Sequence, residues 1–191
     1  MALNVVEIWR DLHKTPELGF EENKTSAYLA EALEKLGFAV TRGVGKTGVM
    51  GVIRGAEPGP VLMLRADMDA LPFRNDDGSI EAVHACGHDS HCAMVLAAAS
   101  ELADRVRRGT LKILFQPAEE GVRGAAGMAA SGILDDADYF LGAHIAMMCK
   151  SGEVSVNPYG FLCTTKLDVT YTGRPAHAGV EPNAGHNAMA A

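Results

Sequence analysis

The sequence predicts an α/β fold, with a mixed, largely parallel sheet flanked by helices. Two observations lead to this prediction. Short apolar runs alternate along the chain with segments of helical periodicity. The run over residues 61–64, Val-Leu-Met-Leu, is continuously apolar, which is typical of a strand buried on both faces.

The elements follow in order from these patterns. A helix is expected over residues 4–14, with Asn4 as N-cap and Glu7 at the capping-box position, and a second from about residue 21 to a stop at Gly37. Asp89 or Ser90 is expected to cap a third helix, and residues 74–82 to form a polar loop. The remaining predictions are strands over 38–42, 48–54, 61–64, 111–115, 139–144 and 152–156, and helices over 90–107 and 124–131.

The chain's 191 residues suit one domain and the start of another. The sequence changes character near Leu162, where an alternating strand over 166–171, a turn and the beginning of a helix near Asn183 are expected. We therefore assign residues 1–162 and 163–191 to different domains. On this interpretation the chain stops in the middle of a helix.

Composition excludes several classes of partner. An apolar content of 48% with 21% charged residues is ordinary for a soluble globular protein. The net charge of −7, without a lysine or arginine cluster, argues against nucleic acid or an anionic membrane as partner. No apolar run has the length of a membrane span, and the N-terminus does not resemble a signal peptide. The sparse cysteines, at positions 86, 92, 149 and 163, are expected to be reduced thiols in a cytoplasmic protein.

Residues 84–91 read His-Ala-Cys-Gly-His-Asp-Ser-His and are the richest segment in metal-binding side chains. In an extended segment, Cys86 and His88 project from the same face. Thiolate and imidazole groups are ligands for zinc and other borderline transition metals. A polar turn would explain so short a motif equally well, so its interpretation depends on other parts of the chain.

Polar clusters also follow the predicted strands, where open α/β sheets bind ligands. Besides Cys86 and His88, these clusters are Asp67 with Asp69, Glu119 with Glu120, and His144. The paired carboxylates of Glu119 and Glu120 repel each other unless a cation binds one of them. One would then hold a metal while the other acts as general base on metal-bound water. Taken singly, the Glu pair could be solvated at a helix start, and His144 could be a core histidine.

Several motifs together resemble the dinuclear-metal amidohydrolases, a family that includes hippurate hydrolase, auxin-conjugate hydrolase and aminobenzoyl-glutamate hydrolase, and is related to aminoacylase and carboxypeptidase G. The resemblance covers the whole chain. The matching segments are His-Lys-Thr-Pro-Glu-Leu-Gly-Phe at 13–20, Leu-Arg-Ala-Asp-Met-Asp-Ala-Leu-Pro at 64–72, His-Ala-Cys-Gly-His-Asp at 84–89, Phe-Gln-Pro-Ala-Glu-Glu at 115–120, Gly-Ala-His at 142–144 and residues 173–187.

This resemblance implies a zinc-exopeptidase-like catalytic domain that binds two divalent metal ions, zinc, manganese or cobalt. The residues implied as metal ligands are Cys86, as a bridge between the ions, with His88, Glu120 and His144.

The resemblance also implies roles for residues that do not bind metal. Glu119 would be the general base, and Asp69 resembles the conserved acid that lies behind the ligands. Asp67 stands where aminoacylase-type relatives have a ligand histidine, so its role is left open. His177 matches a histidine of the smaller domain, which reaches the scissile carbonyl and often does so across a dimer interface.

The implied reaction is hydrolysis of the amide bond of an N-acyl or N-aroyl amino acid, such as hippurate or aminobenzoyl-glutamate, by a cytoplasmic homodimer that pairs through the smaller domain. One departure is serious: the family has a final ligand histidine near its C-terminus, and a whole chain is roughly twice this length. A truncated, inactive metal-binding or dimerisation fragment is therefore one alternative. A thiol hydrolase with Cys86 as nucleophile and His88 or His84 as base is another.

Overall fold

The computed structural model describes residues 3–121, 124–145, 149–156 and 167–190. The chain divides into two compact units, Met1–Glu153 and Val154–Ala191, and each is described by itself.

The first unit is built on a five-stranded sheet with the order β1-β2-β6-β3-β7. The strands are β1 Ala39–Val44, β2 Gly48–Arg54, β3 Glu57–Asp67, β6 Arg108–Gln116 and β7 Tyr139–Gly142. The pairs β1–β2 and β2–β6 are antiparallel, whereas β3 pairs in parallel with both β6 and β7. The predicted mixed sheet flanked by helices is therefore confirmed, and its parallel part is the half that carries the polar clusters.

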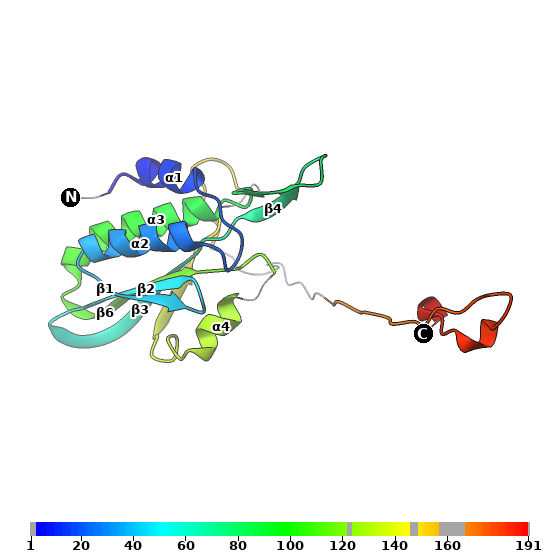
Figure 1. The fold of residues 1–191 in the computed structure, drawn as a ribbon. Helices are drawn as coiled ribbons and strands as arrows, with labels where there is room; N and C mark the ends of the chain where they lie inside the picture. Colours follow the sequence, from blue (N-terminus) through cyan, green and yellow to red (C-terminus); the bar gives the residue numbers. More distant parts are fainter. Residues whose placement is uncertain (1–2, 122–123, 146–148, 157–166, 191) are drawn as a thin grey trace. The chain divides into compact units, whose positions relative to one another are not determined.

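Helices cover both faces of this sheet (Figure 1). Helices α1 Val5–His13, α2 Asn23–Lys35 and α3 His88–Leu102 lie on one face, and the short helix α4 Gly124–Ala130 lies on the other. Strand β6 alternates between them: Leu111, Ile113 and Phe115 belong to the core under α1 to α3, while Leu114 packs with Met128 of α4. Among the described residues, no helix is long and apolar enough to cross a membrane.

The predicted helix starts are confirmed in one case and wrong in another. The Asn4 side chain accepts hydrogen bonds from the N–H groups of Val6 (3.0 Å) and Glu7 (3.4 Å), so it caps α1 as predicted. Helix α3 instead begins at His88, after Gly87, which has the left-handed φ of 90°. Asp89 lies inside the first turn, where its carboxylate pairs with His13 at 2.7 Å and accepts the N–H of Ser90 at 2.8 Å, so it is not the N-cap. The φ at position 87 favours glycine, and a Cβ at Gly87 would in addition lie 2.2 Å from the Cδ1 of Ile145.

The predicted polar loop over 74–82 is a two-stranded hairpin, formed by β4 Leu71–Arg74 and β5 Ile80–Val83. Its turn is stabilised by the Asp77 carboxylate, which accepts hydrogen bonds from the N–H and hydroxyl of Ser79. The hairpin has no buried face, since Phe73 and Ile80 are both exposed. Each strand is only four residues long, and Pro72 weakens the strand signal of the first, so the sequence did not predict them.

The strands expected over 152–156 and 166–171, and the helix expected near Asn183, are not found in the described residues. Residues 152–156 form no strand, and Val154 and Val156 are 87% and 90% exposed. In the second unit, 167–171 are not in a strand, and residue 166 lies outside the described residues. The helix expected near Asn183 is replaced by two short 3₁₀ helices, η2 Pro182–Ala184 and η3 Ala188–Ala190. A strand needs a neighbouring strand to pair its backbone groups, and among the described residues of the second unit the one backbone pairing of this kind is an isolated bridge between Arg174 and His186.

Lys112 is a buried cation in the middle of β6, with only 6% of its surface exposed. Its ammonium group contacts the Asp136 carboxylate and donates to the carbonyl of Ile133 at 3.2 Å. The hydrogen bond from Lys112 lowers the pKa of Asp136 below its usual value. This contact ties the segment after α4 to the strand that leads into the Glu119–Glu120 turn.

We expect Asp136→Ala to destabilise the chain by about 1–2 kcal/mol, because it removes the counter-charge of a buried ammonium group. Urea denaturation at pH 7 measures the effect, and Asp135→Ala is the matched control. Because the folded pKa of Asp136 is lowered, the wild-type advantage is present above the unfolded pKa and should disappear as pH falls below about 4. Equal stability of Asp136→Ala and wild type at pH 7 would contradict the prediction.

Candidate metal centre

The parallel strands bring the polar clusters to one edge of the sheet. In the pairing of β3 with β6, Asp67 is opposite Gln116, so the residues that follow both strands are neighbours. Strand β7 ends at Gly142, opposite Arg65, and leads into His144. Cys86 and the first residue of α3, His88, lie at the same edge. The structure therefore gathers side chains from four separate segments of the chain.

His88 is completely buried, and only one of its ring nitrogens has a hydrogen-bond partner. Its Nδ1 lies 3.3 Å from an Asp69 oxygen, which fixes the ring so that Nε2 faces the edge of the sheet. That Nε2 has no hydrogen-bond partner, but three carboxylate oxygens surround it. They belong to Asp67 at 3.7 Å, Glu120 at 3.8 Å and Glu119 at 4.0 Å.

These distances are too long for hydrogen bonds, but they fit groups that share a cation. Ligand atoms that each lie about 2.0–2.2 Å from one metal ion are separated from one another by roughly 3–4 Å. A carboxylate behind the imidazole, as Asp69 is here, commonly supports histidine ligands. The orphaned nitrogen of His88 is therefore well placed to ligate a metal.

Cys86, His88 and Glu120 form one candidate ligand group, whose ligand atoms all lie within 4.8 Å of one another. His144 adjoins this group, since its Nε2 lies 3.4 Å from the Cys86 sulfur. The Nδ1 of His144 donates to the carbonyl oxygen of Ile145 at 2.6 Å, because a carbonyl can only accept. With the proton on Nδ1, the Nε2 lone pair accepts a hydrogen bond from the Cys86 thiol, and a metal ion that displaces the thiol proton can bind the same lone pair.

The electrostatics of the site favour cations. Burial, together with the neighbouring carboxylates of Glu120, Asp67 and Glu119, raises the pKa of Cys86 to about 12. The thiol is therefore protonated at neutral pH, and a metal ion that binds the sulfur must displace that proton. Among the ion pairs of the described residues, Arg65 is the one lysine or arginine that pairs with a carboxylate of this cluster, that of Asp67. The excess of negative charge fits divalent metal ions.

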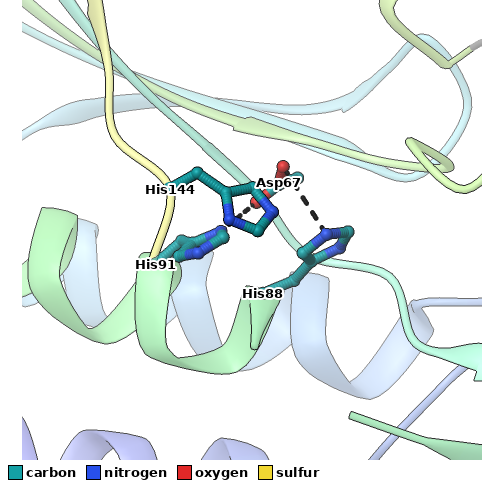
Figure 2. Close-up of side chains that lie close together, drawn as sticks. All are labelled: Asp67, His88, His91 and His144. Carbon is teal, nitrogen blue, oxygen red and sulfur yellow. Dashed lines mark hydrogen bonds and ion pairs between the residues drawn. The ribbon is translucent and has the colours of Figure 1, made fainter. Parts of the chain in front are cut away.

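A second candidate group consists of Asp67, His88, His91 and His144, as shown in Figure 2. Within it, both nitrogens of His91 are already hydrogen-bonded: Nδ1 to Asp67 at 2.6 Å, and Nε2 to the N–H of Ile145 at 3.0 Å. His91 therefore orients Asp67 and anchors the segment that carries His144. Sequence analysis assigned His91 no role, although it lies one helical turn after His88.

Asp67, whose role the sequence left open, is held as an ionised carboxylate. Burial opposes its ionisation, but the hydrogen bond from His91 and the charge of Arg65 outweigh that effect and hold its pKa well below its usual range. Arg65 donates to Asp67 at 2.9 Å and to Gln116 at 2.7 and 3.0 Å, so it also links the ends of β3 and β6.

Asp69 connects His88 to the turn after β6. Its two oxygens accept the backbone N–H groups of Glu119 and Glu120, both at 2.9 Å. Burial raises the pKa of Asp69, but the hydrogen bonds from His88 and from these two N–H groups lower it by more, so the net shift is downward. Of the two adjacent glutamates, Glu120 belongs to a candidate ligand group, whereas the Glu119 side chain is 44% exposed at the same edge.

Three further residues named from the sequence are His177, Cys163 and His84. His177 is in the second unit, where its Nδ1 accepts the N–H of Gly179 at 3.1 Å. Cys163 lies outside the described residues. His84, proposed in one alternative as a base, is buried, and neither of its ring nitrogens has a hydrogen-bond partner among the described residues.

A mixed α/β domain with cysteine, histidine and glutamate side chains at the ends of its parallel strands is typical of metal-dependent hydrolases. The model of the peptidase family M20/M25/M40 matches residues 63–190, and the chain belongs to this family.

Individual relatives agree with this assignment. In Haemophilus influenzae, a homolog of one p-aminobenzoyl-glutamate hydrolase subunit is 36% identical, over 100% of this chain and 58% of the relative. Hippurate hydrolase of Campylobacter jejuni is 40% identical, over 72% of this chain and 38% of the relative. The solved YXEP protein of Bacillus subtilis, described as a dinuclear metal-binding peptidase of the M20 family, is 37% identical with a TM-score of 0.67, over 73% of this chain and 42% of that one.

The expected family is thereby confirmed, as is the expectation that the chain corresponds to its N-terminal part. The chain spans about half the length of the curated relatives that it matches.

Proposed function

We propose that this chain carries most of a dinuclear metal centre that hydrolyses the amide bond of N-acyl or N-aroyl amino acids. The observation that carries the proposal is the buried Nε2 of His88, which has no hydrogen-bond partner and faces three carboxylates. Cys86, His88, Glu120 and His144 would hold the ions. Zinc, manganese and cobalt all suit this mixed ligand set.

Bound at this site, divalent ions would supply Lewis acidity that activates water and polarises the substrate carbonyl. Glu119 has the properties needed to move the proton. Its carboxylate is partly exposed, so substrate and water can reach it, and its backbone is held by Asp69. In the proposed reaction, Glu119 accepts the proton of the attacking water and returns it to the leaving amine.

The substrate class is inferred from relatives whose names include hydrolases of p-aminobenzoyl-glutamate, indole-3-acetyl-aspartic acid and hippurate. All three names describe an acyl or aroyl group joined to an amino acid by an amide bond. We further propose that His177, from the smaller domain over 163–191, stabilises the oxyanion at the scissile carbonyl, and that this domain pairs two chains into a homodimer.

The alternative of a thiol hydrolase requires a cysteine whose pKa is lowered by a neighbouring cation. Cys86 has the opposite environment, because burial and nearby carboxylates raise its pKa to about 12. The Cys86 thiol therefore suits metal binding better than nucleophilic attack.

Metal content tests the proposed function directly. The protein is stripped with a chelator, reloaded with zinc, manganese or cobalt, dialysed, and analysed by plasma mass spectrometry. We expect nearly two ions per chain in a protein with the full length of its relatives, and fewer in residues 1–191, because the resemblance places one ligand histidine outside them. Activity towards hippurate and aminobenzoyl-glutamate should disappear with the metal.

If both proteins are folded and neither binds metal, the proposed function is wrong. Inactivation by iodoacetamide, without any effect of chelators, would then support the thiol hydrolase.

A further inference from the structure

Glu22 is a buried carboxylate far from the candidate ligands in sequence, and its side chain is fully inaccessible to solvent. It occupies the N-cap position of α2, yet its side chain makes no capping hydrogen bond. One oxygen instead accepts the backbone N–H of Ala118 at 2.8 Å, and the other accepts the hydroxyl of Thr47 at 2.5 Å. Among the described residues, no ion pair includes Glu22, so neutral donors alone satisfy this buried group.

Ala118 explains why such a costly group is placed there. It directly precedes Glu119 and Glu120, and it is a non-glycine residue with a left-handed φ of 51°. This conformation is unfavourable for alanine and persists only where the surroundings hold it. The carboxylate of Glu22 accepts the N–H of Ala118, and the carbonyl oxygen of Ala118 accepts the N–H of Gly124 at 3.1 Å. Ala118 is therefore held by hydrogen bonds at both its N–H and its carbonyl.

Two buried carboxylates therefore hold three consecutive backbone N–H groups. Glu22 takes that of Ala118, and Asp69 takes those of Glu119 and Glu120. Asp69 alone would anchor the turn at one end. The bond from Glu22 adds a second anchor, which connects the turn to α2 and, through Thr47, to the loop between β1 and β2.

We propose that Glu22 is a positioning residue: its carboxylate holds the strained turn at Ala118 so that Glu120 meets the metal and Glu119 faces the substrate. The second half of this statement rests on the proposed function, whereas the anchoring of the turn does not.

The test uses cobalt(II) binding to the whole chain, followed by visible absorption, together with amide hydrogen exchange. Glu22→Ala should weaken cobalt binding about 10- to 100-fold, the usual cost of losing a residue that orients a metal ligand. Exchange should accelerate at the amides of Ala118, Glu119 and Glu120 and not elsewhere. Glu22→Gln should restore most of the affinity, because its side-chain carbonyl oxygen can accept the same N–H.

Glu21→Ala is the matched control, since Glu21 is the exposed neighbour and makes no side-chain hydrogen bond among the described residues. A merely structural role would lower the urea midpoint and accelerate exchange throughout, without local acceleration and without rescue by glutamine. Wild-type cobalt affinity in Glu22→Ala, with unchanged exchange at 118–120, would overturn the proposal.

Two further outcomes remain decisive. If Glu22→Ala does not fold, Thr47→Val tests the same anchor by removing one of its two bonds, and unchanged exchange of the Ala118 amide would overturn the proposal. If neither the wild-type chain nor a protein with the full length of its relatives binds cobalt, the proposed function fails, while the exchange rates at 118–120 still decide whether Glu22 holds the turn.

Discussion

Replacing Glu119 with glutamine is expected to lower turnover about 10²- to 10⁴-fold while leaving metal content unchanged. Glutamine has nearly the same shape as glutamate, but its amide cannot take a proton from water. Glu119 belongs to neither candidate ligand group, so the ions should remain bound. The measurements are kcat on an N-acyl amino acid and metal content per chain, both at the full length of the relatives.

Glu120→Gln separates the roles of the two neighbours, because this substitution should lower metal content as well as turnover. Glu31→Gln, on the exposed side of α2, controls for the loss of one negative charge. Turnover of Glu119→Gln close to wild type would exclude Glu119 as the general base. Loss of metal from Glu119→Gln would instead make it a ligand.

Replacing Cys86 with alanine is expected to reduce metal affinity strongly, by more than the 10- to 100-fold typical of residues that only orient ligands. Cys86 is close to the other candidates, within 4.8 Å of His88 and Glu120 and 3.4 Å from His144. In the proposed site Cys86 would bridge both ions, so its loss should affect both. Cobalt titration followed by absorption, with metal content after dialysis, measures the change.

Cys149→Ala is the matched control, because this free cysteine belongs to neither candidate ligand group. A near-ultraviolet sulfur-to-cobalt charge-transfer band should appear in the wild type and in Cys149→Ala, and should be absent from Cys86→Ala. Unchanged cobalt affinity in Cys86→Ala would remove the thiol from the ligand set, and with it the proposed bridge.

The sequence predicted the helices and strands that have a buried apolar face. The apolar run at 61–64 became part of the interior strand β3, and Asn4 capped α1 as expected. Elements without a buried face were predicted less well. The hairpin β4–β5 was missed because each strand has only four residues and the first contains Pro72. The strand over 152–156 was wrongly predicted because Val154 and Val156 have no neighbouring strand among the described residues.

For the candidate site, residue types and strand order allowed the sequence to indicate a cluster. Side chains that follow parallel strands must meet at one edge of the sheet, and cysteine, histidine and glutamate together favour a metal. The resemblance added the separate roles of Glu119 and Glu120, which remain proposals that the variants above test.

The tertiary structure alone decided how these side chains are held. His91 supports Asp67, Asp69 fixes both His88 and the Glu119–Glu120 backbone, and Glu22 reaches Ala118 across 96 residues of sequence. A sequence records local periodicity and residue type, which determine helices, strands and candidate ligands. It does not record which buried polar groups become hydrogen-bond partners, because that depends on segments that meet only when the chain has folded.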